Sequence, residues 1–348
     1  MNPYVLAILL FSLGLGTTLT FASSHWLLAW MGLEINTLAI VPLMAYKHHP
    51  RAVEATTKYF LTQATAAAMI LFASTTNAWM TGEWEITQLS NPIACTIAMT
   101  ALALKIGLAP THFWLPEVLQ GITLTTGLIL STWQKLAPFA LILQVAENAH
   151  PYLLTVLAVC STLVGGWGGL NQTQLRKILA YSSVAHLGWM ILVAQMAPHM
   201  TLLALITYIM MTTAAFLTLN KVDSTKTVTL ASTWTKAPTL SALACLILLS
   251  LGGLPPLTGF MPKWFILQEV SNQGFPLTAT VIALTALLSL YFYLRLSYAM
   301  TLTLSPYTTN FSAPWRAPTK QPTLLLSSAV VMATCLLPLT PSALALLA

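Results

Sequence analysis

The sequence predicts an all-α polytopic membrane protein, because the chain is long, strongly apolar and almost free of charge. Of its 348 residues, 57% are hydrophobic and only 6% are charged, whereas soluble domains carry about 25% charged residues. The mean hydropathy is +0.77. So few charged side chains cannot cover the surface of a soluble fold of this size. This excludes a soluble enzyme, a nucleic-acid-binding protein and a disordered chain.

About eleven apolar stretches are long enough to cross a bilayer, whose hydrocarbon core needs about 20 helical residues. We delimit them by turn-forming and charged residues and number them as spans one to eleven in chain order. They cover residues 3–22, 25–45, 55–78, 92–119, 123–146, 150–170, 174–195, 199–219, 238–271, 276–301 and 322–346. Spans four and nine are longer than the others and contain both Gly and Pro.

The basic residues fall on one face of the membrane if all eleven stretches span it. Of the 14 Lys and Arg residues, all except three lie near the ends of the even-numbered spans or in the loops after them. The loops on the other face carry glutamates instead, at positions 83, 85, 147 and 269. This distribution follows the positive-inside rule. It predicts an N-terminus on the inner side and a C-terminus on the outer side.

Spans four and nine share a helix-breaking motif. The pattern G-L-x-P-x-x-x-x-x-P begins at Gly107 in span four and at Gly253 in span nine. Proline removes a backbone donor and clashes with the preceding helical turn. We therefore expect a broken helix in each span, with the breaks at Gly107, Pro110, Gly253 and Pro256.

The spacing of the two breaks predicts an inverted repeat. Five spans separate them, and an odd number reverses the direction of the second unit relative to the membrane. We expect one membrane domain over 1–348, with a first five-helix repeat at 1–146, a second, inverted one at 150–301, and a C-terminal transmembrane helix at 322–346. Broken helices in corresponding positions of two such repeats indicate an ion or substrate path.

Four ionisable residues lie well inside the spans: Glu34, Lys105, Lys135 and Lys263. A charge at the bilayer centre costs roughly 2.5–3.5 kcal/mol even on the mildest scale, so these groups need partners or water. Burial favours the neutral form of such groups, and a neighbouring opposite charge favours the charged form. A lysine between these effects can exchange a proton, whereas arginine stays protonated. We predict a proton relay; the alternative is a static ion pair of Glu34 with one lysine.

Three further residues are weaker candidates. His112 follows the first break and His186 lies in span seven, and a histidine can relay protons near neutral pH. A neutral histidine that only packs is an equal alternative for both positions. Glu117, near the inner end of span four, is a candidate for proton uptake. The chain has no glycine-rich nucleotide motif and no clustered cysteines, so we expect no cofactor or metal site within it.

The residues around the first break resemble a known signature. Residues 104–117 read L-K-I-G-L-A-P-T-H-F-W-L-P-E, similar to the K…P-x-H-x-W-L-P signature of the antiporter-like membrane subunits of respiratory complex I. Within that family, the start M-N-P, the Glu34 span, R-K-I-L-A-Y-S-S-V-A-H-L-G at 176–188 and G-G-L-P-P-L-T-G-F at 252–260 look like the subunit 2 group of vertebrate mitochondrial NADH–ubiquinone oxidoreductases. The resemblance covers essentially the whole chain.

The resemblance implies a location and a function. It implies a multi-pass core subunit of the mitochondrial inner membrane, with the N-terminus on the matrix side and the C-terminus on the intermembrane-space side. The subunit would carry a proton-translocation path driven by electron transfer from NADH to ubiquinone in other subunits. The family's functional glutamate falls on Glu34, and its central lysines fall on Lys105, Lys135 and Lys263. Bacterial relatives have fourteen spans, so eleven spans imply that three at the N-terminus are missing.

The resemblance also implies cofactors and partners. NAD, FMN, iron–sulfur clusters and ubiquinone are expected in partner subunits and not in this chain. The expected partners are other complex I subunits, especially neighbouring antiporter-like ones, together with membrane lipids such as cardiolipin, and no nucleic acid. Two alternative functions stay open, namely a subunit of a cation/proton antiporter and a purely structural membrane subunit whose charges form static pairs.

Overall fold

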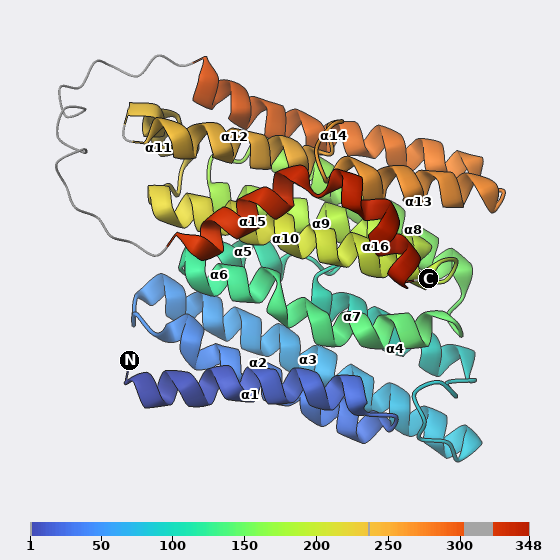
Figure 1. Ribbon diagram of the computed structural model, residues 1–348. Helices are drawn as coiled ribbons and strands as arrows, with labels where there is room; N and C mark the ends of the chain where they lie inside the picture. Colours follow the sequence, from blue (N-terminus) through green and yellow to red (C-terminus); the bar gives the residue numbers. More distant parts are fainter. Residues whose placement is uncertain (1, 236, 303–322, 348) are drawn as a thin grey trace. The chain divides into compact units, whose positions relative to one another are not determined.

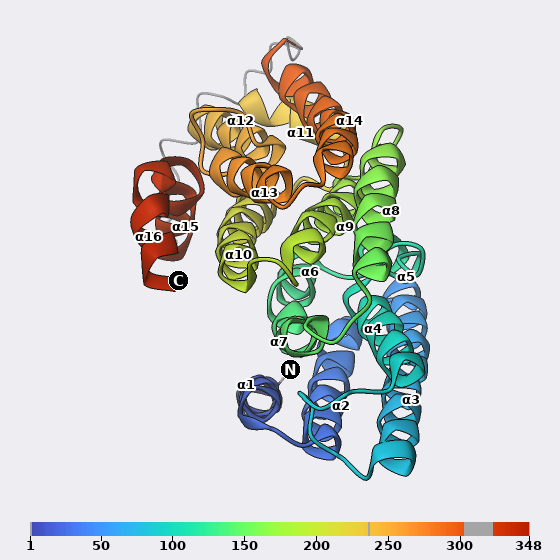
Figure 2. The same cartoon turned by 90° about the vertical axis from the view of Figure 1, so that its right-hand side faces the viewer.

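The structure confirms the all-α class. The computed structural model describes residues 2–235, 237–302 and 323–347, and these ranges form helices without an extended strand (Figures 1 and 2). Three of the basic residues used to orient the chain, Lys236, Arg316 and Lys320, lie outside them. The chain divides into two compact units, residues 1–161 with 190–198, and residues 162–189 with 199–348. We describe each unit by itself.

The described ranges consist of helices joined by turns and loops. The first half of the chain contains α1 (Pro3–Ala22), α2 (Trp26–Ala45), α3 (Pro50–Thr81), α4 (Pro92–Ile106), α5 (Trp114–Gly121), α6 (Leu124–Ser131), α7 (Trp133–Ala146) and α8 (Pro151–Gly169). The second half contains α9 (Leu175–Val193), α10 (Pro198–Val222), α11 (Thr227–Ala231), η1 (Ser232–Thr235), α12 (Pro238–Gly252), α13 (Phe260–Asn272), α14 (Pro276–Thr301), α15 (Leu324–Cys335), η4 (Leu337–Leu339) and α16 (Thr340–Leu347).

Each expected span coincides with one helix or with consecutive helices. By length and composition, six helices in the described ranges can cross a membrane: α1, α2, α6 together with α7, α8, α10 and α14. The number rises to seven if the bent pair at the C-terminus counts as one span. Helices α4 and α12 are apolar but shorter. The protein is therefore a multi-pass helical protein, and the count of eleven spans stays a prediction.

Local sequence explains where several helices begin. Asn2, His49 and Asn91 each precede a proline, and each side chain accepts a hydrogen bond from the backbone N–H two residues on. A polar side chain at the N-cap satisfies a free donor, and proline at the first helical position has no donor to satisfy. The same two-residue signal thus starts α1, α3 and α4.

Both expected helix breaks are found. Helix α4 ends at Ile106 and is capped by Gly107 at φ +87°, and α12 ends at Gly252 and is capped by Gly253 at φ +79°. This left-handed conformation favours glycine, which lacks a Cβ. The next helices start only after residues 107–113 and 253–259. The inverted relation of the two repeats is not tested by these positions and stays a prediction.

Two further interruptions differ from the expected continuous spans. Span five is interrupted at Thr132, between α6 and α7. Pro138 cannot donate a backbone hydrogen bond in α7, and the Thr132 hydroxyl donates to the Leu128 carbonyl at 2.7 Å, a bond that often bends helices. Span eleven is bent by 68° between α15 and α16, where Pro338 interrupts the helix. Lys135 is consequently near the start of a helix, and not in the middle of one.

A buried lysine cavity as the candidate functional site

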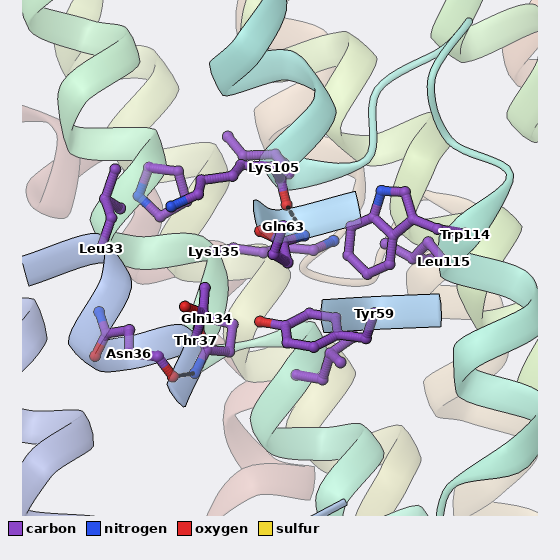
Figure 3. A pocket seen from close by; sticks show the side chains of 13 residues that line it. Leu33, Asn36, Thr37, Tyr59, Gln63, Lys105, Trp114, Leu115, Gln134 and Lys135 are labelled. Carbon is purple, nitrogen blue, oxygen red and sulfur yellow. Dashed lines mark hydrogen bonds between the residues drawn. The ribbon is translucent and has the colours of Figure 1, made fainter. Parts of the chain in front are cut away.

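The first unit contains a buried cavity lined by two of the expected relay lysines (Figure 3). Lys105 comes from α4 and is 5% exposed, and Lys135 comes from α7 and is 3% exposed. The structure therefore places two lysines that are 30 residues apart in the chain (135 minus 105) in the lining of one cavity. The other lining residues are Leu33, Asn36, Thr37, Tyr59, Gln63, Ile106, Trp114, Leu115, Leu130, Gln134 and Pro138.

The broken helix positions Lys105. The break deprives the last carbonyls of α4 of their usual helical donors, and such groups need other partners inside a membrane. The Trp114 indole N–H donates to the Leu104 carbonyl at 3.0 Å, and the Gln63 amide donates to the Lys105 carbonyl at 3.3 Å. A cationic side chain is also favoured in the last turn of a helix. The break thus creates a polar helix end that suits a buried amine.

The interruption of span five positions Lys135. This residue lies in the first turn of α7, directly after Gln134. The Gln134 amide donates to the Asn36 backbone carbonyl at 3.2 Å, which ties α7 to α2. The wall that carries the second lysine is therefore fixed to the helix that carries Glu34.

Glu34 influences the cavity through space. Its charge acts electrostatically on Lys105 and on Tyr59. No ion pair links Glu34 to Lys105 in the described part of the chain. One carboxylate oxygen of Glu34 and the amine of Lys105 are buried without a hydrogen-bond partner among the described residues. The two opposite charges thus interact without being locked together.

The cavity has room for water. Its volume of about 20 Å³ for water centres compares with about 10–15 Å³ needed for one molecule. Tyr59 and Trp114 close part of the wall through an edge-to-face contact, with their ring centroids 5.7 Å apart. The cavity that the two lysines line can therefore hold a molecule of the size of water.

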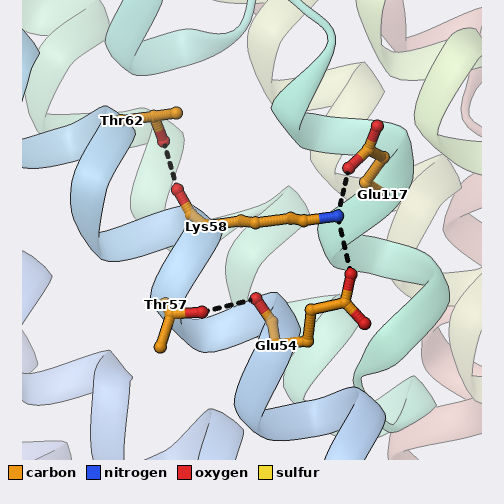
Figure 4. Close-up of polar contacts among 5 residues, drawn as sticks. All are labelled: Glu54, Thr57, Lys58, Thr62 and Glu117. Carbon is orange, nitrogen blue, oxygen red and sulfur yellow. Dashed lines mark hydrogen bonds and ion pairs between the residues drawn. The ribbon is translucent and has the colours of Figure 1, made fainter.

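The two remaining candidates of the first unit lie elsewhere. His112 is buried, bonds to the Pro110 backbone and packs on Phe113 with ring centroids 4.4 Å apart, but it does not line the cavity. Glu117 lies on α5 with 53% of its side chain exposed and pairs with Lys58 at 2.7 Å (Figure 4). Lys58 also pairs with Glu54 at 2.8 Å, and this hydrogen bond lowers the pKa of the Glu54 carboxyl.

In the second unit, Lys263 lies next to the other helix break. Its amine donates to the Gly252 carbonyl at 2.8 Å, so it caps the end of α12. A Cβ on Gly253 would be 2.9 Å from this amine, so glycine leaves the room for the contact. His186 bonds to the Ser182 carbonyl at 2.7 Å, and its ring centroid is 5.6 Å from that of Tyr208. Within the described ranges, no group of three His, Cys, Asp or Glu residues is placed to hold a metal ion.

The sequence interpretation missed the amides of the cavity. Asn36, Gln63 and Gln134 lie within apolar helices and line the cavity wall. The sequence did contain a signal for these residues, since an amide in an apolar span is costly unless it is hydrogen-bonded. The helical face that each amide occupies, however, depends on tertiary packing.

The match to a family model decides which proteins this chain belongs with. The model described as NADH:quinone oxidoreductase/Mrp antiporter, transmembrane, matches residues 23–289. The chain belongs to this family. Residues 290–344 match a second model, described as NADH dehydrogenase subunit 2 C-terminus, so the two models together cover nearly the whole of this member of the NADH:quinone oxidoreductase/Mrp antiporter family.

Similar family members are known from fishes. A protein of Carassius auratus named NADH-ubiquinone oxidoreductase chain 2 is 74% identical over 346 residues, which are 99% of each chain. The protein of the same name from Oncorhynchus mykiss is 71% identical over 348 residues, which are 100% of each chain. The chain therefore resembles these two proteins over its full length.

Solved structures show the same fold. A chain of respiratory complex I from Thermus thermophilus is 30% identical, with a TM-score of 0.85 over 98% of this chain and 79% of that one. A chain of the Mrp complex from Dietzia sp. is 16% identical, with a TM-score of 0.81 over 97% of this chain and 75% of that one. The second likeness concerns the fold alone.

Proposed function

We propose that this chain translocates protons as a membrane subunit of respiratory complex I, with Lys105 and Lys135 as neighbouring proton carriers. The subunit belongs to the NADH–ubiquinone oxidoreductase, and its partner subunits hold NAD, FMN, iron–sulfur clusters and ubiquinone. The proton carriers are assigned from one observation. Lys105 and Lys135 come from different helices, are both buried and line the same cavity.

The electrostatics of the cavity favour proton exchange between the two amines. Two like charges in one desolvated site disfavour each other, so one proton shared between two amines is more stable than two. A carboxylate near an amine favours the protonated amine, and we assign this role toward Lys105 to Glu34. A movement of Glu34 away from Lys105 would therefore make Lys135 the more favourable site for the shared proton. In the described residues no ion pair joins Glu34 to Lys105, and one Glu34 carboxylate oxygen has no hydrogen-bond partner.

The remaining candidates extend this path. Lys263 is the carrier of the second unit, next to the break at Gly253. His112, in the linker that follows the break at Gly107, and His186, in helix α9, are additional relay groups. Glu117 takes up protons at the inner face, where its side chain is 53% exposed and pairs with Lys58.

Family membership and the charge distribution support the following location. The protein lies in the mitochondrial inner membrane, with its N-terminus in the matrix and its C-terminus in the intermembrane space. Its neighbours are other antiporter-like subunits, with lipids such as cardiolipin around the apolar surface. Two five-helix repeats at 1–146 and 150–301 and a helix at 322–346 form the membrane domain.

A Lys105→Met variant, studied in the assembled complex, tests this function. Methionine keeps the length of the side chain and removes the protonatable amine. We expect at least a tenfold loss of ubiquinone-coupled proton pumping, measured in proteoliposomes. NADH oxidation by a water-soluble artificial acceptor should persist, since it does not require the membrane path.

The matched control is Lys47→Met, which removes an exposed loop amine and should leave pumping unchanged. A Lys105→Met complex with a normal number of protons per electron would show that the cavity lysines form static packing contacts and that the proposal is wrong.

A further inference from the structure

We propose that Asn36 is a positioning residue that binds water in the lysine cavity and so bridges Lys105 and Lys135. This inference rests on the proposed function and deepens it. It assigns a ligand, a water molecule, and a role to a residue that takes no direct part in proton uptake or release. Asn36 lies on α2, two residues after Glu34, and lines the cavity (Figure 3).

The side chain of Asn36 is buried without a partner. It is 2% exposed, and both its Oδ1 and its Nδ2 atoms have no hydrogen-bond partner within the described ranges. A buried amide left without partners destabilises the fold, and buried polar groups are almost always satisfied by protein or by ordered water. The amide therefore indicates a bound polar molecule.

Three other polar side chains of the cavity wall, Gln63, Gln134 and Thr37, already donate hydrogen bonds to the backbone. Of the three lining amides in the described part of the chain, Gln63 and Gln134 donate to backbone carbonyls. The hydroxyl of Thr37 donates to the Glu34 carbonyl at 2.8 Å. Asn36 thus differs from its neighbours, because its donor and its acceptor are both left for a ligand.

A second buried group points to the same ligand. The amine of Lys105 lines the cavity and has no hydrogen-bond partner among the described residues. A buried water molecule makes two to four hydrogen bonds and fits a volume of about 10–15 Å³, and the cavity offers about 20 Å³. A water molecule can accept from the ammonium group and donate to the Asn36 Oδ1 atom, which satisfies both groups at once.

Two contacts hold Asn36 in place. Its side chain packs directly against the backbone of α1, because Gly16 has no Cβ; a Cβ there would be 2.8 Å from the Asn36 Cγ atom. Its backbone carbonyl accepts the hydrogen bond from Gln134. The side chain is therefore packed against α1, and the backbone at this residue is tied to α7.

The bound water gives the two amines a route for exchange. The Lys105 ammonium passes one proton to the water while the water passes another of its protons to the neutral Lys135 amine. The products are a neutral Lys105, an unchanged water molecule and a protonated Lys135, so atoms and charge balance. Asn36 keeps its own protons throughout and only orients the water.

The test compares Asn36→Leu with Thr37→Val in the assembled complex. Both substitutions replace a polar side chain in the cavity wall with an apolar one of similar size, but only Asn36 has unused donors and acceptors. We expect Asn36→Leu to remove the water density from the cavity in a cryo-electron microscopy map and to slow coupled pumping at least fivefold. Thr37→Val should change neither. Asn36→Ser, which restores a hydroxyl and leaves space for water, should recover pumping in part and is the variant to use if Asn36→Leu does not assemble.

Each outcome separates this inference from the proposed function. Normal pumping by Asn36→Leu, with reduced pumping by Lys105→Met, would reject the role of Asn36 and leave the lysine path standing. Slow pumping by Asn36→Leu with unchanged water density would also reject the inference, because the effect would not act through the water. Normal pumping by both variants would reject the proposed function as well.

Discussion

Gly16 illustrates how one residue without a side chain positions a polar group on the neighbouring helix. Helices α1 and α2 pack side by side (Figure 2), and Gly16 and Gly32 allow their backbones to approach closely. A Cβ on Gly16 would be 2.8 Å from the Gly32 carbonyl oxygen, and a Cβ on Gly32 would be 2.8 Å from that of Gly16. Small residues at helix contacts are the usual means of close packing in membranes.

Gly16→Ala should therefore destabilise the protein, although alanine normally favours a helix. Overpacking a close contact costs about 1–3 kcal/mol, which exceeds the gain in helix propensity of up to about 1 kcal/mol. Gly14→Ala is the matched control, since a Cβ at Gly14 would have nothing within 4 Å. The measurement is the amount of assembled complex that survives a series of heating steps. Equal survival of the two variants would contradict the close contact.

Residues whose chemistry is local were predictable, and residues whose role depends on packing were not. The lysines of the cavity were predicted from the sequence, because a charged residue in an apolar span is costly on whichever face of the helix it lies. Asn36 and Gln63 were not found, since an amide on α2 or α3 faces the cavity only after the helices have packed.

At the scale of the elements, a polar contact connects the second helix break to the C-terminal bend. The Ser250 hydroxyl on α12 donates to the Ala333 carbonyl of α15 at 2.7 Å, and the Thr258 hydroxyl in the linker after α12 contacts the same oxygen. Helix α15 ends two residues later, at Cys335, so this carbonyl lies where the helical hydrogen-bond ladder stops. The two hydroxyls thus take the place of the helical N–H donor that the Ala333 carbonyl loses at the bend.

The double substitution Ser250→Ala with Thr258→Val should loosen the C-terminal bend. A buried carbonyl left without a donor costs roughly 1–3 kcal/mol. We expect faster hydrogen–deuterium exchange in residues 333–340, measured by mass spectrometry on the assembled complex. Ser327→Ala is the control, because that hydroxyl is exposed and bonds only within its own helix. Unchanged exchange in the double variant would show that the bend is set by Pro338 alone.

Helix breaks were predictable where two signals coincide. Gly107 and Gly253 each precede a proline-containing linker, and both capping and proline geometry are local properties of the chain. The interruption at Thr132 was missed because its signals, a threonine and a proline six residues on, are common in continuous helices. The bend after Cys335 was missed although Pro338 and Pro341 lie there, because apolar residues continue on both sides of them.

At the scale of the whole molecule, the orientation in the membrane is the prediction that remains to be tested. Lys47 precedes α3 and Glu83 follows it, and both are exposed. Helix α3 has 32 residues, which correspond to a length of about 48 Å against a hydrocarbon core of about 30 Å. If α3 spans the membrane, the two residues lie on opposite faces. The positive-inside rule then places Lys47 in the matrix and Glu83 in the intermembrane space.

Labelling with a membrane-impermeant maleimide distinguishes the two orientations. Glu83→Cys should react in intact mitoplasts, whose outer surface is the intermembrane-space face, whereas Lys47→Cys should react only after the membrane is permeabilised. The unsubstituted chain gives the background from its four cysteines. The reverse pattern would invert the whole topology and move Glu117 away from the matrix. Because Glu117 lies in the same unit and pairs with Lys58 near the start of α3, its assignment to proton uptake from the matrix depends on this result.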